Sequence, residues 1–174
     1  MVAAIVLAAG AATRFGAPKQ ALLLPEVLRW VRASSVEEVV VVAGAHPVAT
    51  DARVVLCPDW ERGPGASLRC GLAALGEDVE AAVVVLADGP DLSPAAVDRV
   101  VAAWRGGAGP IVAASYGRDR GHPVVLDRAL WGRIPDEGAR ALEPVLVPCD
   151  DLGPPGDVDR ADDMPGRLSE GAEE

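Results

Sequence analysis

The stretch VAAIVLAAGAATRFGAPKQ, residues 2–20, decides the fold prediction. Its first seven residues, 2–8, are all apolar and predict a strand that is buried on both faces. Gly10 ends this run, and a loop of mainly small residues leads to Lys19, the only lysine beside fifteen arginines. Small residues let the backbone approach a ligand closely, so this loop is the first candidate for a binding site.

Further along the chain, apolar runs alternate with helical patterns. Strands are expected at residues 38–43, 53–57, 81–87, 110–114, 122–126 and 145–147. Helices are expected at residues 25–33, 67–75, 93–104 and 136–142. Pro25 would start the first of these helices and Ser67 would cap the second. Ser93 would be the N-cap of the third, followed by Pro94 in its first turn. Uninterrupted apolar strands that alternate with helices predict an α/β fold of three layers, Rossmann-like, with a mostly parallel sheet and helices on both faces. Ligands of such sheets bind at the carboxyl ends of the strands.

The chain of 174 residues is expected to form one domain over residues 1–163, followed by a flexible acidic tail over 164–174. The net charge of −10 and the lack of a basic stripe argue against a nucleic-acid surface. The apolar run at the N-terminus has no basic residues before it and is too short to span a membrane, so we expect no membrane contact and a cytoplasmic protein. The three cysteines are widely spaced and predict unpaired thiols.

The loop after the first strand carries two cations, Arg14 and Lys19. Gly10 and Gly16 are spaced G-x5-G, which matches neither the dinucleotide-binding G-x-G-x-x-G nor the P-loop. Exposed backbone N–H groups with two nearby cations can form a phosphate site. On these residues alone, a loop with two solvated charges is an equally good interpretation.

Carboxylates provide a candidate metal site. Asp88 stands where the apolar run 81–87 ends, and Asp157 and Asp159 belong to a late acidic segment. Mg2+ prefers oxygen ligands and is typically held by one or two carboxylates together with substrate phosphates. An acidic protein that binds a polyanion needs such a cation, because like charges 4 Å apart repel by roughly 4 kcal/mol at an effective dielectric constant near 20. The alternatives to a metal site are that Asp88 is an aspartate of a turn, and that Asp157 and Asp159 belong to a solvated acidic stretch.

The motif L-A-A-G-x-x-x-R-x-G-x-x-K at residues 7–19 resembles the signature of the MobA-like nucleotidyltransferases, nearest to the molybdenum cofactor cytidylyltransferase type. Five further segments resemble motifs of the family in the same order: GPGASLRCGL (63–72), VLADGPDL (85–92), GRDRGHPVVL (117–126), DEGAR (136–140) and DVDRADDM (157–164). The resemblance therefore extends over roughly residues 3–164.

This resemblance implies a nucleotide-diphospho-sugar transferase-like fold and a Mg2+-dependent transfer of a nucleotidyl group. CMP, in preference to GMP, would pass from CTP or GTP to a phosphorylated acceptor such as the molybdopterin cofactor, with release of pyrophosphate. Arg14 and Lys19 would be catalytic, Asp88 with Asp157 or Asp159 would hold the metal, and His122 and Arg140 would contact the acceptor. The nucleotide would be bound by Leu7, Ala8, Ala9, Gly10, Gly65 and Ser67. A molybdoenzyme or a maturation protein would be the partner.

Two departures from the family pattern keep other interpretations open. The segment ALLL (21–24) runs directly into PEVLRW (25–30), where the family usually has a glycine-rich turn, and the metal segment reads Asp-Gly-Pro-Asp in place of Asp-Gln-Pro. One alternative is a degenerate nucleotide- or cofactor-binding module without turnover. A nicotinamide-linked reductase is weaker, because the G-x-G-x-x-G motif is absent. On the residues alone, two alternatives also stay open: a turn or packing role before Pro123 for His122, and a solvated helix arginine for Arg140.

Overall fold

The computed structural model describes residues 1–10, 19–157 and 166, and the side chains of residues 19–21 lie outside that description. Arg14, Asp159, the side chain of Lys19 and all of residues 164–174 except Gly166 are therefore not part of the structural account. The strands are β1 (Val2–Ala8), β2 (Glu38–Ala43), β3 (Arg53–Leu56), β4 (Ala81–Leu86), β5 (Ile111–Tyr116), β6 (Asp119–Asp127) and β7 (Val145–Pro148). The helices are α1 (Lys19–Arg32), α2 (Pro64–Ala73) and α3 (Pro94–Arg105), with 3-10 turns η1 (Trp60–Arg62), η2 (Arg128–Arg133), η3 (Ala139–Ala141) and η4 (Asp150–Leu152).

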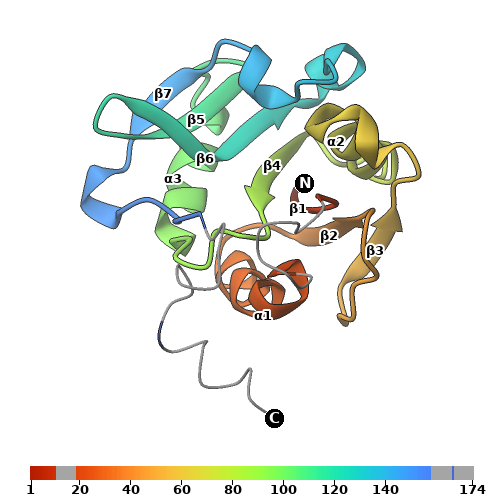
Figure 1. Cartoon of the computed structure of the whole chain (residues 1–174). Coiled ribbons are helices and arrows are strands. Elements are labelled where there is room, and N and C mark those ends of the chain that lie inside the picture. The colour runs from red at the N-terminus through yellow and green to blue at the C-terminus, as the bar shows by residue number, and fades with distance from the viewer. Residues whose placement is uncertain (11–18, 158–165, 167–174) are drawn as a thin grey trace.

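The strands form one seven-stranded sheet in the order β3-β2-β1-β4-β6-β5-β7 (Figure 1). β6 is antiparallel to both of its neighbours, and every other pairing is parallel. The chain builds outward from β1 to β3 and then returns to β4 on the other side of β1. The strand order thus reverses between β1 and β4, and crevices at such reversals are where open α/β sheets bind ligands.

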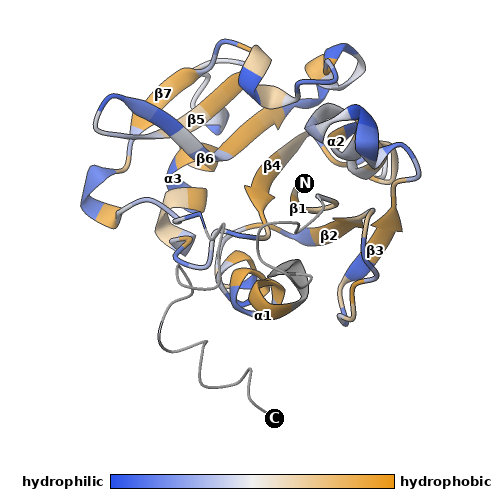
Figure 2. Cartoon of the chain, in the orientation of Figure 1, coloured by the Kyte–Doolittle hydropathy of each residue, from blue (hydrophilic) through white to orange (hydrophobic). Residues whose placement is uncertain are grey.

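Alternate residues of each strand face different helices, so the sheet has two separate apolar layers. Ala4 and Val6 of β1 belong to the cluster that α1 and α3 cover, whereas Ala3 and Ile5 belong to the cluster that α2 covers. Figure 2 shows the corresponding apolar colour along the central strands. This arrangement confirms the predicted mostly parallel sheet with helices on both faces. No helix of the described residues combines the length and apolar composition needed to cross a membrane.

The predicted start of the first helix at Pro25 is wrong. α1 begins at Lys19 and contains Pro25 in its interior. Leu23 and Leu24, which precede the proline, are buried together with Val27 and Leu28, which follow it. Burial of this continuous apolar face outweighs the backbone hydrogen bond that proline cannot donate. The segment 21–24, where the family pattern has a turn, is therefore helical.

Two other local predictions need correction. α2 begins at Pro64 after Gly63, so Ser67 is a buried residue of the helix and not its N-cap. Of the helix expected over 136–142, only the 3-10 turn η3 forms, because Gly138 adopts a φ of 83° that interrupts helical geometry.

Candidate active site

A pocket of ≈ 310 Å³ lies at the carboxyl ends of β1 and β4, where the strand order reverses. Its lining comprises Leu7, Ala9, Gly10, Trp60, Glu61, Gly63, Pro64, Ser67, Leu86 and Asp88. Just beyond the last paired residues, the backbone N–H of Ala87 donates to the carbonyl oxygen of Leu7 at 3.0 Å, which holds the two strand ends together. The pocket therefore joins the segment after β1 to the segment after β4.

The β1 side of the pocket contains most of the residues predicted to contact a nucleotide. Leu7, Ala9 and Gly10 line it, whereas Ala8 is buried in the layer under α1 and α3. The carbonyl oxygen of Ala9 accepts a hydrogen bond of 3.2 Å from the N–H of Ala45, which fixes the chain where it leaves the sheet. The small side chains of Ala9 and Gly10 leave the backbone accessible at this side of the pocket.

Asp88 lies on the β4 side and is partly buried, with its Oδ1 atom shielded from solvent. A shielded carboxylate oxygen at the edge of a pocket is a suitable ligand for a hard divalent cation. Among the described residues there is no group of three or more histidine, cysteine or acidic side chains that could enclose a metal. A cation held by Asp88 would therefore need further ligands from outside this set.

The segment before Asp157 lies beside the turn that follows Asp88. The backbone N–H of Asp91 donates to the carbonyl oxygen of Pro155 at 2.8 Å. A Cβ added to Gly89 would stand 3.1 Å from Cβ of Pro155 and 3.4 Å from the carbonyl oxygen of Gly156. Asp157 is the next residue and is exposed. The fold thus brings it into the neighbourhood of Asp88, although the two residues are 69 positions apart in the sequence.

His122 is close enough to Asp88 to interact with its charge, but it lines a separate cavity of ≈ 30 Å³ together with Gly89 and Pro155. Burial lowers the pKa of His122 to about 4, and Arg120 acts in the same direction while Asp88 opposes both. The imidazole is therefore neutral near pH 7. The backbone oxygen of His122 accepts a hydrogen bond from the hydroxyl of Tyr116 at 2.8 Å, which connects β6 to the end of β5.

The second wall of the pocket comes from η1 and the start of α2. Trp60 packs flush against the backbone of Gly44, where an added Cβ would lie 2.6 Å from Cβ of Trp60. Ser67 is buried in the first turn of α2 and lines the pocket. Trp60 thus packs against the core and also forms part of the pocket.

Gly65 and Arg140 lie outside the pocket lining. The N–H of Gly65 donates to the carbonyl oxygen of Asp136 at 2.9 Å, and a Cβ at Gly65 would lie 1.7 Å from the carbonyl oxygen of Pro135. The structure therefore shows Gly65 as the position where α2 packs against the segment 134–138. Arg140 is an exposed residue of η3, and its backbone oxygen is one of three carbonyls near the guanidinium of Arg120.

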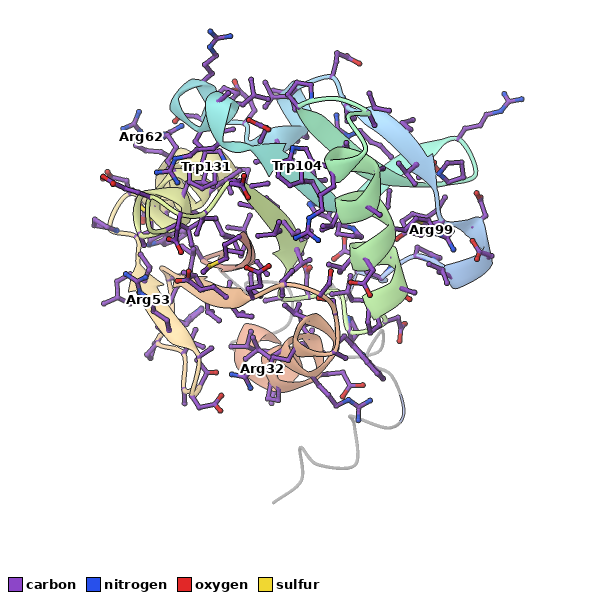
Figure 3. All side chains as sticks on the ribbon, turned by 180° about the vertical axis from the view of Figure 1, so that it is seen from behind. Arg32, Arg53, Arg62, Arg99, Trp104 and Trp131 are labelled. Carbon is purple, nitrogen blue, oxygen red and sulfur yellow. The ribbon has the colours of Figure 1, made fainter. Side chains whose placement is uncertain are left out.

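None of the described arginines lines the pocket. Those labelled in Figure 3 lie on the outside of the molecule, and each pairs with a carboxylate: Arg32 with Asp51, Arg53 with Glu38, Arg62 with Asp136 and Arg99 with Asp151. Within residues 1–10 and 22–157, the pocket lining includes two charged side chains, Glu61 and Asp88, and both are acidic. An anionic ligand therefore needs positive charge from outside this set.

The family described as the MobA-like NTP transferase domain matches residues 4–146. The chain belongs to this family. Membership of this family identifies the chain as a nucleotidyltransferase and confirms the resemblance seen in its motifs. No curated protein matches the sequence.

Solved structures of similar chains share the fold. The chain is 29% identical to Rv0371c of Mycobacterium tuberculosis H37Rv, with a TM-score of 0.80 and 97% of each chain covered. A manganese complex of Rv0371c is 27% identical, with a TM-score of 0.75 and coverage of 97% and 98%. A nucleotidyl transferase from Methanothermobacter thermautotrophicus is 20% identical, with a TM-score of 0.70 and 94% of each chain covered, and this likeness shows the fold alone.

Sequence reasoning missed Trp60, Glu61 and Leu86 as pocket residues. Leu86 is the last residue of β4, and Trp60 and Glu61 follow the carboxyl end of β3. The rule that ligands bind at the carboxyl ends of parallel strands could have pointed to all three. The sequence alone did not show that η1 reaches the pocket beside the end of β1.

Proposed function

We propose that this chain transfers a nucleotidyl group, CMP in preference to GMP, from CTP or GTP to a phosphorylated acceptor such as the molybdopterin cofactor. The observation that carries the proposal is the pocket between β1 and β4. It brings the L-A-A-G segment, through Leu7, Ala9 and Gly10, together with Asp88 and Ser67. These residues are far apart in sequence and were each predicted to serve the nucleotide or its metal.

The charge distribution supports a triphosphate held by the loop after β1. The described lining of the pocket is acidic, and the first helix begins at Lys19, directly after residues 11–18. Arg14 and Lys19 would supply the positive charge that the rest of the pocket lacks. Loss of such a charge-stabilising group typically reduces turnover by a factor of about 100 to 1,000.

A divalent cation fits the carboxylate oxygens of this site. Asp88 would hold it, with Asp157 or Asp159 as a second ligand, and the packing of residues 155–156 against Gly89 supports the approach of that segment. The manganese complex of the similar protein Rv0371c also favours a divalent metal, and we propose Mg2+. When bound, the cation would neutralise charge on the triphosphate.

The chemistry requires positioning and no protein nucleophile. An oxygen of the acceptor phosphate would attack the α-phosphorus in line, the bond from that phosphorus to the bridging oxygen would break, and pyrophosphate would leave. Arg14 and Lys19 would bind the oxygens of the departing pyrophosphate. His122 and Arg140 remain our candidates for contacts with the acceptor. A cytoplasmic location and delivery of the product to a molybdoenzyme or a maturation protein complete the proposal.

The test is a pyrophosphate-release assay with the full chain, MgCl2, molybdopterin cofactor and each of the four NTPs. We expect release that needs the metal and the acceptor and is fastest with CTP. Binding of NTP and metal without pyrophosphate release, with this acceptor and with other phosphorylated acceptors, would identify a binding module and contradict the proposal. Binding of NAD(P)H in place of NTP would also contradict it.

A further inference from the structure

Glu61 is an acidic residue in a pocket whose proposed ligand is an anion. Its side chain is exposed on η1 and lines the pocket next to Trp60. Among the described residues, Glu61 takes part in no ion pair, whereas the adjacent Arg62 contacts Asp136 at 3.4 Å. No cation of the described residues neutralises this carboxylate, and a carboxylate repels phosphate. A position away from this wall is therefore more favourable for the phosphates.

The two acidic residues of the lining come from different walls. Asp88 follows β4, on the side where β1 also ends, whereas Glu61 comes from η1 beside the start of α2. If the triphosphate occupies the wall formed by the ends of β1 and β4, the base or the ribose must face η1. A carboxylate accepts hydrogen bonds and donates none at neutral pH, so Glu61 faces a donor on the ligand.

Glu61 is held in place by contacts on both sides of it. Trp60 packs against the backbone of Gly44, and Arg62 reaches Asp136. Gly63, which ends η1, has a φ of 128°, and an added Cβ would stand 2.6 Å from the carbonyl oxygen of Asp136. These contacts hold the backbone of Glu61 in place. A residue that selects between ligands needs such a fixed position.

We infer that Glu61 is a specificity-determining residue that accepts a hydrogen bond from the exocyclic amino group of the nucleotide base. The inference rests on the proposed function. The ligand chemistry is an amino-bearing base: cytosine offers its N4 amino group, and guanine offers N1–H and its N2 amino group side by side. Carboxylates accept from the cytosine amino group in nucleic-acid recognition as well. Uracil places a carbonyl oxygen where cytosine has its amino group, and that oxygen would meet the carboxylate as a second acceptor.

The test compares nucleotides that differ at this group. Equilibrium binding and turnover would be measured with CTP against UTP and with GTP against ITP, for the wild type, Glu61→Gln and Glu61→Ala, all with MgCl2. We expect the wild type to prefer the amino-bearing nucleotide of one pair by about 10- to 100-fold, the range for an exposed charged acceptor. Both variants should reduce this preference to a few-fold. The pair that shows the effect identifies the base as cytosine or guanine.

Controls separate this inference from a structural effect and from the proposed function. Glu77→Gln changes an exposed glutamate after α2, outside the pocket, and should leave the preference unchanged. An arm with 2′-deoxy-CTP and CTP tests the ribose: if Glu61→Gln changes only the ratio of these two, Glu61 contacts the ribose and the inference is overturned. Unchanged CTP/UTP and GTP/ITP ratios in an active Glu61→Gln enzyme also overturn it. Failure of the wild type to bind any NTP would contradict the proposed function itself.

Discussion

The guanidinium of Arg69 donates a hydrogen bond of 2.5 Å from Nη2 to Oδ1 of Asp136, 67 positions away. Nη1 of Arg69 also donates to the carbonyl oxygen of Ile134 at 2.8 Å. Arg69 belongs to α2, whose first turns line the pocket, and Asp136 begins the DEGAR segment. Because Arg62 of η1 reaches the same carboxylate, Asp136 connects both parts of the second wall.

Asp136→Asn should weaken nucleotide binding more than it weakens the fold. The amide can still accept from Arg69 but carries no charge to hold Arg62, so η1 should become less well positioned. We expect KM for the nucleotide to rise several-fold with a small change in kcat and a small decrease in Tm. Asp51→Asn is the matched control, because it removes an exposed carboxylate paired with Arg32 at 2.8 Å, away from η1. Equal KM changes in both variants would contradict a positioning role for Asp136.

The same carboxylate should make stability depend on pH. The hydrogen bond from Arg69, helped by the charge of Arg62, holds the pKa of Asp136 below its usual value. A lowered carboxyl pKa stabilises the folded state above the unfolded pKa, near 4, and this contribution is lost as pH falls through the lower folded value. The difference in unfolding free energy between wild type and Asp136→Asn should thus be constant from pH 7 to 5 and decrease below about pH 4. Urea titrations at each pH would measure it.

Gly65→Ala should be strongly destabilising. Its Cβ would lie 1.7 Å from the carbonyl oxygen of Pro135, which is backbone and cannot swing aside. Overpacking of this kind costs about 1–3 kcal/mol or more. Gly132→Ala is the control, because an added Cβ there meets nothing within 4 Å. Similar Tm values for the two variants would show that the packing of α2 against residues 135–136 is looser than described.

Asp88→Asn should remove metal-dependent turnover while the fold persists. Replacement of one carboxylate oxygen by an amide weakens a hard cation site, and we expect turnover to decrease by about 100-fold or more. Titration of Mn2+ followed by electron paramagnetic resonance, with nucleotide present, gives a readout that does not depend on turnover. Asp119→Asn, in an exposed residue at the start of β6, is the control. Wild-type Mn2+ affinity in Asp88→Asn would contradict the metal assignment.

Lys19→Ala and Arg14→Ala should each reduce turnover by about 100-fold or more, because each removes a proposed partner of the triphosphate. The described pocket lining offers no cation to replace them. Arg118→Ala, in an exposed residue between β5 and β6, controls for the change in net charge. Turnover at the wild-type level in either variant would exclude that residue from phosphate binding.

The sequence determined the layers of this protein and the residues at its strand ends. Continuous apolar runs at Val2–Ala8 and Ala81–Leu86 predicted central strands, because only a strand covered on both faces can be apolar at every position. The rule for strand ends then placed Gly10 and Asp88 at one edge of the sheet. The family motifs added the nucleotidyltransferase identity that the chain's family membership confirms.

The tertiary structure decided what depends on packing between distant segments. α1 continues through Pro25 because the burial of leucines on both sides of it outweighs the loss of one backbone hydrogen bond. The helix propensity of the local sequence does not include this burial, so it could not predict the result. Trp60 and Glu61 reach the pocket because Gly44, Gly63 and Asp136 fix the path of η1. Residue spacing in the sequence cannot predict this path, because it depends on contacts between residues as far apart as Arg62 and Asp136, which are 74 positions from each other.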